Sequence, residues 1–82
     1  MIIVGIDPAL AITGYGVIQV KKTYLALIEA GIIQTSAKEP TAKRLDKIHR
    51  GILKLISDTR ADCLVLEKIY SHYKHPATAC IL

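Results

Sequence analysis

The sequence predicts an α/β protein whose mixed sheet combines a β-hairpin with a parallel crossover, in the order βββαβα. Residues 2–6 and 63–66 are short, nearly continuous apolar runs, which are typical of strands covered on both faces. The segment between them has apolar residues at helical spacing over 42–57. A helix between two buried strands implies a right-handed crossover and a parallel pair. Two further strand-like segments, separated by a short polar link, precede this helix and predict the hairpin.

The first three predicted strands follow each other closely. The run Ile2–Ile6 ends before Pro8, which has no N–H to donate to a central ladder. Residues 13–20 form the second strand, whose two glycines allow a backbone or a ligand to approach closely. Residues 24–35 form the third strand. The link at residues 21–23 is short, so the second and third strands are expected to be antiparallel neighbours.

A helix is predicted from about Ala42 to Ser57, with Thr41 as its N-cap. Its apolar face consists of Leu45, Ile48, Ile52, Leu55 and Ile56. A second face is basic and consists of Lys43, Lys47, Arg50 and Lys54. This basic face could contact phosphate groups, although such a face is more often simply solvated.

The last part of the sequence begins with the second apolar run, which Glu67 follows at once. The polar segment Ser71–Pro76 predicts a loop, and Ala77–Leu82 is typical of the first turns of another helix. We therefore expect the strand that ends at Glu67 to form an open edge of the sheet.

Composition limits the class of protein. The 82 residues are 51% hydrophobic and 22% charged, which is typical of one small globular domain. No apolar run reaches the roughly 18 residues of a membrane span, and the N-terminus is unlike a signal peptide. Two cysteines without zinc-site spacing suggest reduced thiols and a cytoplasmic protein. The net charge of +4 mildly favours nucleic acid as a partner, whereas four tyrosines without Phe or Trp argue against a stacking platform for single strands.

Two acidic residues, Asp7 and Glu67, each directly follow a buried run. On neighbouring parallel strands both carboxylates would emerge at the carboxyl edge of the sheet, where open α/β sheets bind ligands. Two close carboxylates repel each other unless a cation lies between them. Mg²⁺ suits such a site because it prefers oxygen ligands and leaves room for a substrate phosphate. The alternative is that Asp7 merely begins a turn and Glu67 merely ends a strand.

The residues around both acids resemble the RuvC family of Holliday-junction resolvases, within the RNase H-like superfamily. The motifs are GIDPALA at residues 5–11, TGYGVI at 13–18 and LEKIY at 66–70, with similar residues at 31–36, 44–45 and 78–79. The resemblance extends over essentially the whole chain. It implies that residues 1–82 are the N-terminal part of a single RNase H-like nuclease domain, ending before its last strand and helix.

The resemblance implies a Mg²⁺-dependent, structure-specific DNA endonuclease that resolves four-way (Holliday) junctions in recombination and repair. Such enzymes act as homodimers, with two metal ions, beside the branch-migration proteins RuvA and RuvB. By motif match, Asp7 and Glu67 are catalytic and metal-binding acids. Tyr70 lies where the family often has an aromatic residue that contacts DNA. Lys68 and Lys74, which flank the same loop, are candidates for contacts with the DNA backbone.

Three features depart from the family pattern. Ala9 stands where the family usually has glycine, so it could strain the loop after Asp7. Residues 71–76 differ from the common version and are one residue longer. The family also has two further metal-binding acids in a part that would follow residue 82. We therefore expect residues 1–82 alone to be inactive.

Other functions remain open on the sequence alone. A YqgF-type nuclease also has Asp-Pro after its first strand, although LEKIY favours RuvC. Half of an actin-like ATPase is a poorer match, because that fold prefers a glycine-rich turn after the aspartate. A non-catalytic DNA-binding partial domain would need no metal. His72 and His75 could join Glu67 in a metal site, but imidazole suits Zn²⁺ better than Mg²⁺.

Overall fold

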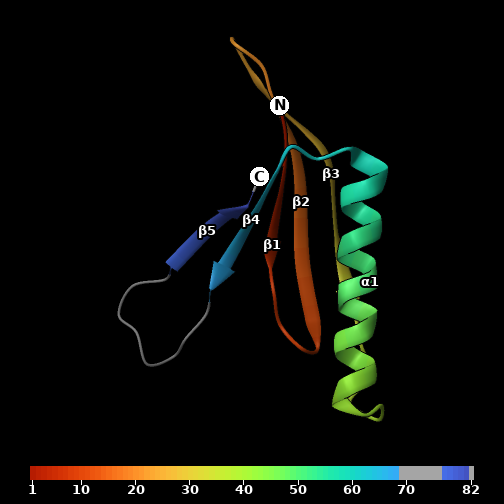
Figure 1. The fold of residues 1–82 in the computed structure, drawn as a ribbon. Helices are drawn as coiled ribbons and strands as arrows, with labels where there is room; N and C mark the ends of the chain where they lie inside the picture. Colours follow the sequence, from red (N-terminus) through yellow and green to blue (C-terminus); the bar gives the residue numbers. More distant parts are fainter. Residues whose placement is uncertain (69–76, 82) are drawn as a thin grey trace.

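A computed structural model describes residues 1–68 and 77–81 of the chain. Its five strands form one sheet in the order β3-β2-β1-β4-β5, with a single helix in the described part (Figure 1). The elements are β1 (Ile2–Asp7), β2 (Ile12–Val20), β3 (Leu25–Gln34), α1 (Thr41–Thr59), β4 (Cys63–Lys68) and β5 (Ala77–Ile81).

The central strand β1 has neighbours of both directions. It pairs antiparallel with β2, where Asp7 faces Gly14, and parallel with β4, where Ile6 faces Leu66. Asp62 bonds Ile2 at the start of the parallel pair. Its carboxylate accepts the Ile2 N–H at 2.7 Å, and its N–H donates to the Ile2 carbonyl at 2.8 Å. Strand β2 also pairs antiparallel with β3, which confirms the predicted hairpin, and the parallel pairing of β1 with β4 confirms the predicted crossover.

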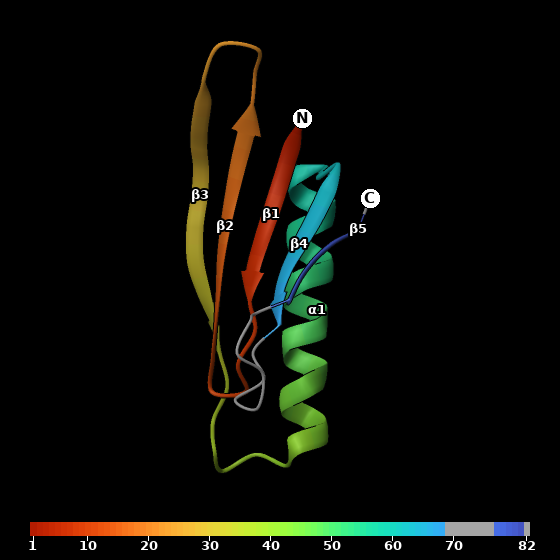
Figure 2. The same cartoon turned by 90° about the vertical axis from the view of Figure 1, so that its left-hand side faces the viewer.

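Helix α1 lies on one side of the sheet, and the core is formed between them (Figure 2). Val4, Ile6 and Val17 point to this side and meet Leu55 of α1. Side chains alternate along a strand, so Gly5 and its odd-numbered neighbours in β1 lie on the opposite face. The sheet therefore has one face covered by α1 and one face without a helix among the described residues.

The expected helix at Ala77–Leu82 is wrong for the residues that the structure describes. Ala77–Ile81 forms β5, antiparallel to β4, with Glu67 facing Thr78. The strand supplies partners for the second edge of β4, whose backbone groups would otherwise be unpaired. Glu67 is therefore not on an edge strand, and β3 and β5 are the edges. Leu82 lies outside the described residues.

Helix α1 differs from expectation at its first turn. Its N-cap is Pro40, whose carbonyl accepts the N–H groups of Lys43 and Arg44, and there is no side-chain cap. Thr41 is the first helical residue rather than the cap. Leu45 was expected on the apolar face but is 56% exposed, and it borders a shallow hollow together with Ile48 and residues of the β1–β2 connection.

Cys63 also differs from expectation. It is buried in β4 and takes part in a disulfide bond, whereas the sequence predicted a reduced thiol. The second cysteine of the sequence lies on β5, the strand whose pairing with β4 the sequence did not predict. Among the described residues, no helix is long and apolar enough to cross a membrane.

Candidate active site

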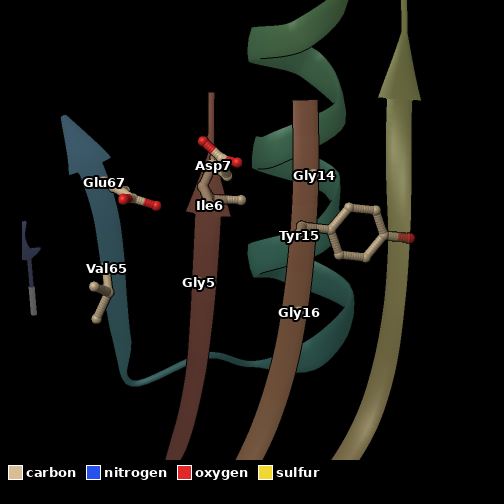
Figure 3. Close-up of a pocket in the computed structure, with 8 residues that line it drawn as sticks. All are labelled: Gly5, Ile6, Asp7, Gly14, Tyr15, Gly16, Val65 and Glu67. Atoms are coloured by element: carbon tan, nitrogen blue, oxygen red, sulfur yellow. The ribbon is translucent and has the colours of Figure 1, made fainter. Parts of the chain in front are cut away.

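Asp7 and Glu67 lie side by side at the carboxyl edge of the sheet. Asp7 ends β1, and Glu67 follows the residue of β4 that pairs with Ile6. Both side chains are exposed and point to the face opposite α1, toward the space between their two strands (Figure 3). The expectation that neighbouring parallel strands bring the two carboxyl groups to one cleft agrees with this placement.

The two acids line a cavity of about 400 Å³ on the open face of the sheet. Its floor consists of Gly5 and two glycines of β2 that face β1 across the ladder (Figure 3). A Cβ atom at Gly14 or Gly16 would meet no atom within 4 Å, so neither glycine is required by packing among the described residues. The backbone here is bare, and a ligand can come close to it beside the two carboxylates.

Tyr15 belongs to the other face, although its backbone borders the cavity. Its ring packs beside the core and extends over Gly31 of β3 (Figure 3). A hydrogen bond to the Glu29 side chain, followed by desolvation and the charge of Glu29, raises the pKa of Tyr15 above its usual value. The Tyr15 ring therefore belongs to the helix-side layer, although the residue borders the cavity.

The connection after Asp7, residues Pro8–Ala11, is held by side chains that the sequence did not single out. Thr13 and Thr35 are buried and bond the backbone of this connection, and Arg44 bonds Thr35. The sequence offered little signal for them, because Thr35 lies 24 residues after Ala11 and burial is known only from the structure. Ala9 has no positive φ, so alanine fits here without the expected backbone strain.

The donor set suits Mg²⁺. The two carboxylates are hard oxygen ligands that face one cavity, and Mg²⁺ typically binds one or two carboxylates and completes its shell with water and phosphate. Within the described residues, no group of three or more His, Cys, Asp or Glu side chains could hold a metal ion. Two carboxylates match the number that Mg²⁺ usually takes from a protein.

The remaining predicted residues divide into two groups. Tyr70, Lys74, His72 and His75 lie outside the described residues. Lys68 ends β4, and its side chain is likewise outside the description. The basic face of α1 lies on the opposite side of the sheet from the cavity, and two of its members pair within the helix: Arg50 with Asp46 at 3.0 Å and Lys54 with Asp58 at 2.9 Å. These pairs favour the interpretation of a solvated face.

Curated relatives share the sequence over nearly its whole length. A family model described as crossover junction endodeoxyribonuclease RuvC matches residues 3–81. The RuvC of Rhodopirellula baltica is 39% identical over 80 residues, which cover 98% of this chain and 45% of the relative. The RuvC of Natranaerobius thermophilus is 37% identical over 70 residues, 85% of this chain and 44% of the relative. The chain therefore spans under half the length of these relatives.

Solved RuvC structures also resemble this chain in fold. The Thermus thermophilus RuvC in complex with a Holliday junction substrate superposes with a TM-score of 0.78 and 28% identity, over 92% of this chain and 46% of that one. A second Thermus thermophilus RuvC structure gives a TM-score of 0.77 at 25% identity, over 92% of this chain and 48% of that one. Both the sequence and the fold thus match the RuvC family. The chain belongs to the RuvC family of crossover junction endodeoxyribonucleases, which are metal-dependent nucleases.

Proposed function

We propose that this protein is a Mg²⁺-dependent endonuclease that resolves four-way DNA junctions, with Asp7 and Glu67 as catalytic metal ligands. The observation that carries the proposal is the pair of exposed carboxylates on adjacent parallel strands, both lining one cavity. Its support is the family match and a structural neighbour described as bound to a Holliday junction.

The proposed site separates two tasks. Mg²⁺ bound by Asp7 and Glu67, as two ions in the complete site, would activate a water molecule and stabilise the leaving oxygen of the phosphodiester. The role of the two carboxylates would be to hold the metal ions in place. The protein groups beside them must let the DNA backbone come close, and the glycine floor has no side chain to oppose it.

Charge supports a polyanionic substrate. The chain carries 11 Lys and Arg against 7 Asp and Glu. Contacts from lysine and arginine to phosphate supply most of the affinity in nucleic-acid binding, while the acids act on the scissile phosphate. We assign Tyr70, Lys68 and Lys74 to DNA contacts near the junction, because all three lie within the seven residues after Glu67.

The wider assembly follows from the same proposal. Two strands of a junction must be cut symmetrically, which a homodimer with one site per protomer can do. We propose this homodimer, with RuvA and RuvB as partners, and place the protein in the cytoplasm, where its DNA substrate would be found.

The test is cleavage of a synthetic four-way junction by the full-length protein. Asp7→Asn keeps the size of the side chain but loses the charge that holds the cation. We expect Asp7→Asn and Glu67→Gln each to lower the Mg²⁺-dependent cleavage rate by more than about a hundredfold, because even outer-shell changes can cost 10–100-fold. Junction binding, measured by gel shift in Ca²⁺, should change little.

Asp46→Asn is the matched control, because Asp46 is an exposed aspartate on the other side of the sheet. It should cleave at the rate of the wild type. Cleavage by Asp7→Asn at the wild-type rate would remove Asp7 from the mechanism. A wild type that binds the junction in Mg²⁺ without cutting it would instead support the non-catalytic DNA-binding alternative.

A further inference from the structure

The connection from β1 to β2 is exposed along its whole length, although it directly follows Asp7. Every side chain of Pro8–Ala11 is exposed, so packing contributes little to holding it. Its backbone is instead bonded to the two buried threonines Thr13 and Thr35. Two sets of interactions therefore surround Asp7. One is its pairing with Gly14 across the ladder, and the other is the hydrogen bonding of the connection that follows it.

Thr13 holds the middle of this connection. The residue is 0% exposed, and its hydroxyl donates to the Ala9 carbonyl at 2.8 Å. The same oxygen accepts the Ala9 N–H at 3.2 Å. One hydroxyl thereby satisfies both backbone groups of a residue two positions after Asp7, which fixes the peptide planes on either side of it.

Thr35 holds the end of the connection, and Arg44 orients Thr35. The Thr35 hydroxyl donates to the Leu10 carbonyl at 2.5 Å, and the Thr35 N–H donates to the Ala11 carbonyl at 3.0 Å. Arg44 Nε donates to the same hydroxyl at 2.9 Å. A guanidinium has no acceptor, so the hydroxyl hydrogen is directed away from Arg44 and toward Leu10.

We infer that Thr35 and Arg44 are positioning residues for Asp7: they anchor the β1–β2 connection to α1 and so hold the Asp7 carboxylate beside Glu67. The inference rests on the proposed function of these two acids as metal ligands. Neither residue lines the cavity or contacts a reacting group. Residues that fix the orientation of a metal-binding side chain without touching the metal can change metal affinity, which gives the inference a measurable consequence.

The test measures metal affinity in the full-length protein. Mn²⁺ is the probe, its binding is followed by electron paramagnetic resonance, and the Mg²⁺ concentration for half-maximal junction cleavage is measured in parallel. We expect Thr35→Val and Arg44→Met each to weaken Mn²⁺ binding by about tenfold. The half-saturating Mg²⁺ concentration should rise by the same factor, while the rate at saturating Mg²⁺ and the junction affinity change less.

Two variants separate positioning from general destabilisation. Thr35→Ser keeps the hydroxyl and should restore wild-type metal affinity. Thr59→Val removes a threonine bond of the same kind, from Thr59 Oγ1 to the Leu55 carbonyl at 2.7 Å, but at the far end of α1. It should leave metal affinity unchanged. If Thr35→Val does not fold, Arg44→Met carries the same test.

The outcomes distinguish this inference from the proposed function. A wild type that binds no Mn²⁺ contradicts the metal site itself, and the positioning role with it. A wild type that binds Mn²⁺, together with Thr35→Val and Arg44→Met variants that bind it equally well, contradicts the positioning role alone. Equal weakening by Thr59→Val would also overturn it, because the effect would then be one of stability.

Discussion

At the scale of the residue, Tyr15 and Gly31 depend on each other. They face each other across the β2–β3 ladder, and the tyrosine ring lies directly over the glycine. A Cβ atom at position 31 would lie 2.6 Å from the Tyr15 hydroxyl oxygen and 2.8 Å from Cζ. Both separations are well below ordinary contact, so a side chain at this position must displace the ring and its bond to Glu29.

We therefore expect Gly31→Ala to lower the free energy of unfolding by about 1–3 kcal/mol, as overpacking does. The pKa of Tyr15, which the hydrogen bond to Glu29 raises, should fall back toward its ordinary value. Urea unfolding measures the first effect, and titration of ¹³Cζ-labelled tyrosine measures the second. Gly14→Ala is the control, because a Cβ there meets nothing within 4 Å. Equal stability of the two variants would contradict this account of Gly31.

At the scale of the element, α1 ends on a residue whose backbone is strained. Arg60 has φ 54° and ψ 46°, and its N–H and that of Ala61 bond the last carbonyls of the helix. It is the single non-glycine residue with positive φ in the described part of the chain. Left-handed backbone costs an L-residue roughly 1–2 kcal/mol, and helices commonly end on glycine in this position for that reason.

Arg60→Gly should accordingly raise the free energy of unfolding by about 1 kcal/mol. Chemical denaturation of the two proteins under identical conditions measures the difference. Arg60→Ala removes the same charge and side chain but retains a Cβ, so it should give no such gain. If alanine stabilised as much as glycine, the guanidinium rather than the backbone would be the source of the effect.

At the scale of the whole molecule, one helix covers one face of a five-stranded sheet. The accessible surface is 6195 Å² for a chain of 9.0 kDa, whereas a compact monomer of this mass exposes about 4,900 Å². The radius of gyration is 13.7 Å, against about 11.7 Å for a compact domain of this length. Large apolar side chains remain exposed, notably Leu25 and Leu27 on edge strand β3, each 69% exposed.

Residues 1–82 as an isolated chain should therefore be marginally stable and should self-associate. We expect a free energy of unfolding below about 3 kcal/mol in urea, the lower end of what a single small core supplies. Sedimentation velocity should show mass increasing with protein concentration, because β3 presents an apolar edge. The isolated chain should also fail to cleave a junction. This expectation would be refuted by an isolated chain that stays monomeric and unfolds in one sharp transition, with a free energy of unfolding well above about 3 kcal/mol.

Much of the molecule could be predicted from residues close together in the sequence. Uninterrupted apolar runs indicate β1 and β4, helical spacing indicates α1, and the short link at Lys21–Thr23 indicates the hairpin. These patterns are local: the spacing of apolar residues depends on the type of element that buries them and not on which elements it packs against. The acids were predictable as a pair for the same reason, since each directly follows an apolar run.

Errors arose where a contact with a distant part of the chain decided the outcome. Ala77–Ile81 has no strong pattern of its own and becomes a strand because β4 offers it an unpaired edge. The sequence did not single out Arg44, whose side chain bonds Thr35 just after the end of β3.

Local sequence patterns thus specify the order of elements from β1 to β4, the family motifs and the two acids. The tertiary structure alone decided which face Asp7 and Glu67 share, that bare glycine backbone lies beside them, and which side chains hold the connection after Asp7. The physical reason is the range of the interactions. Hydrophobic periodicity records whether a residue is buried, whereas a hydrogen bond between residues 25 positions apart, such as that from Thr35 to Leu10, exists only once the sheet has brought them together.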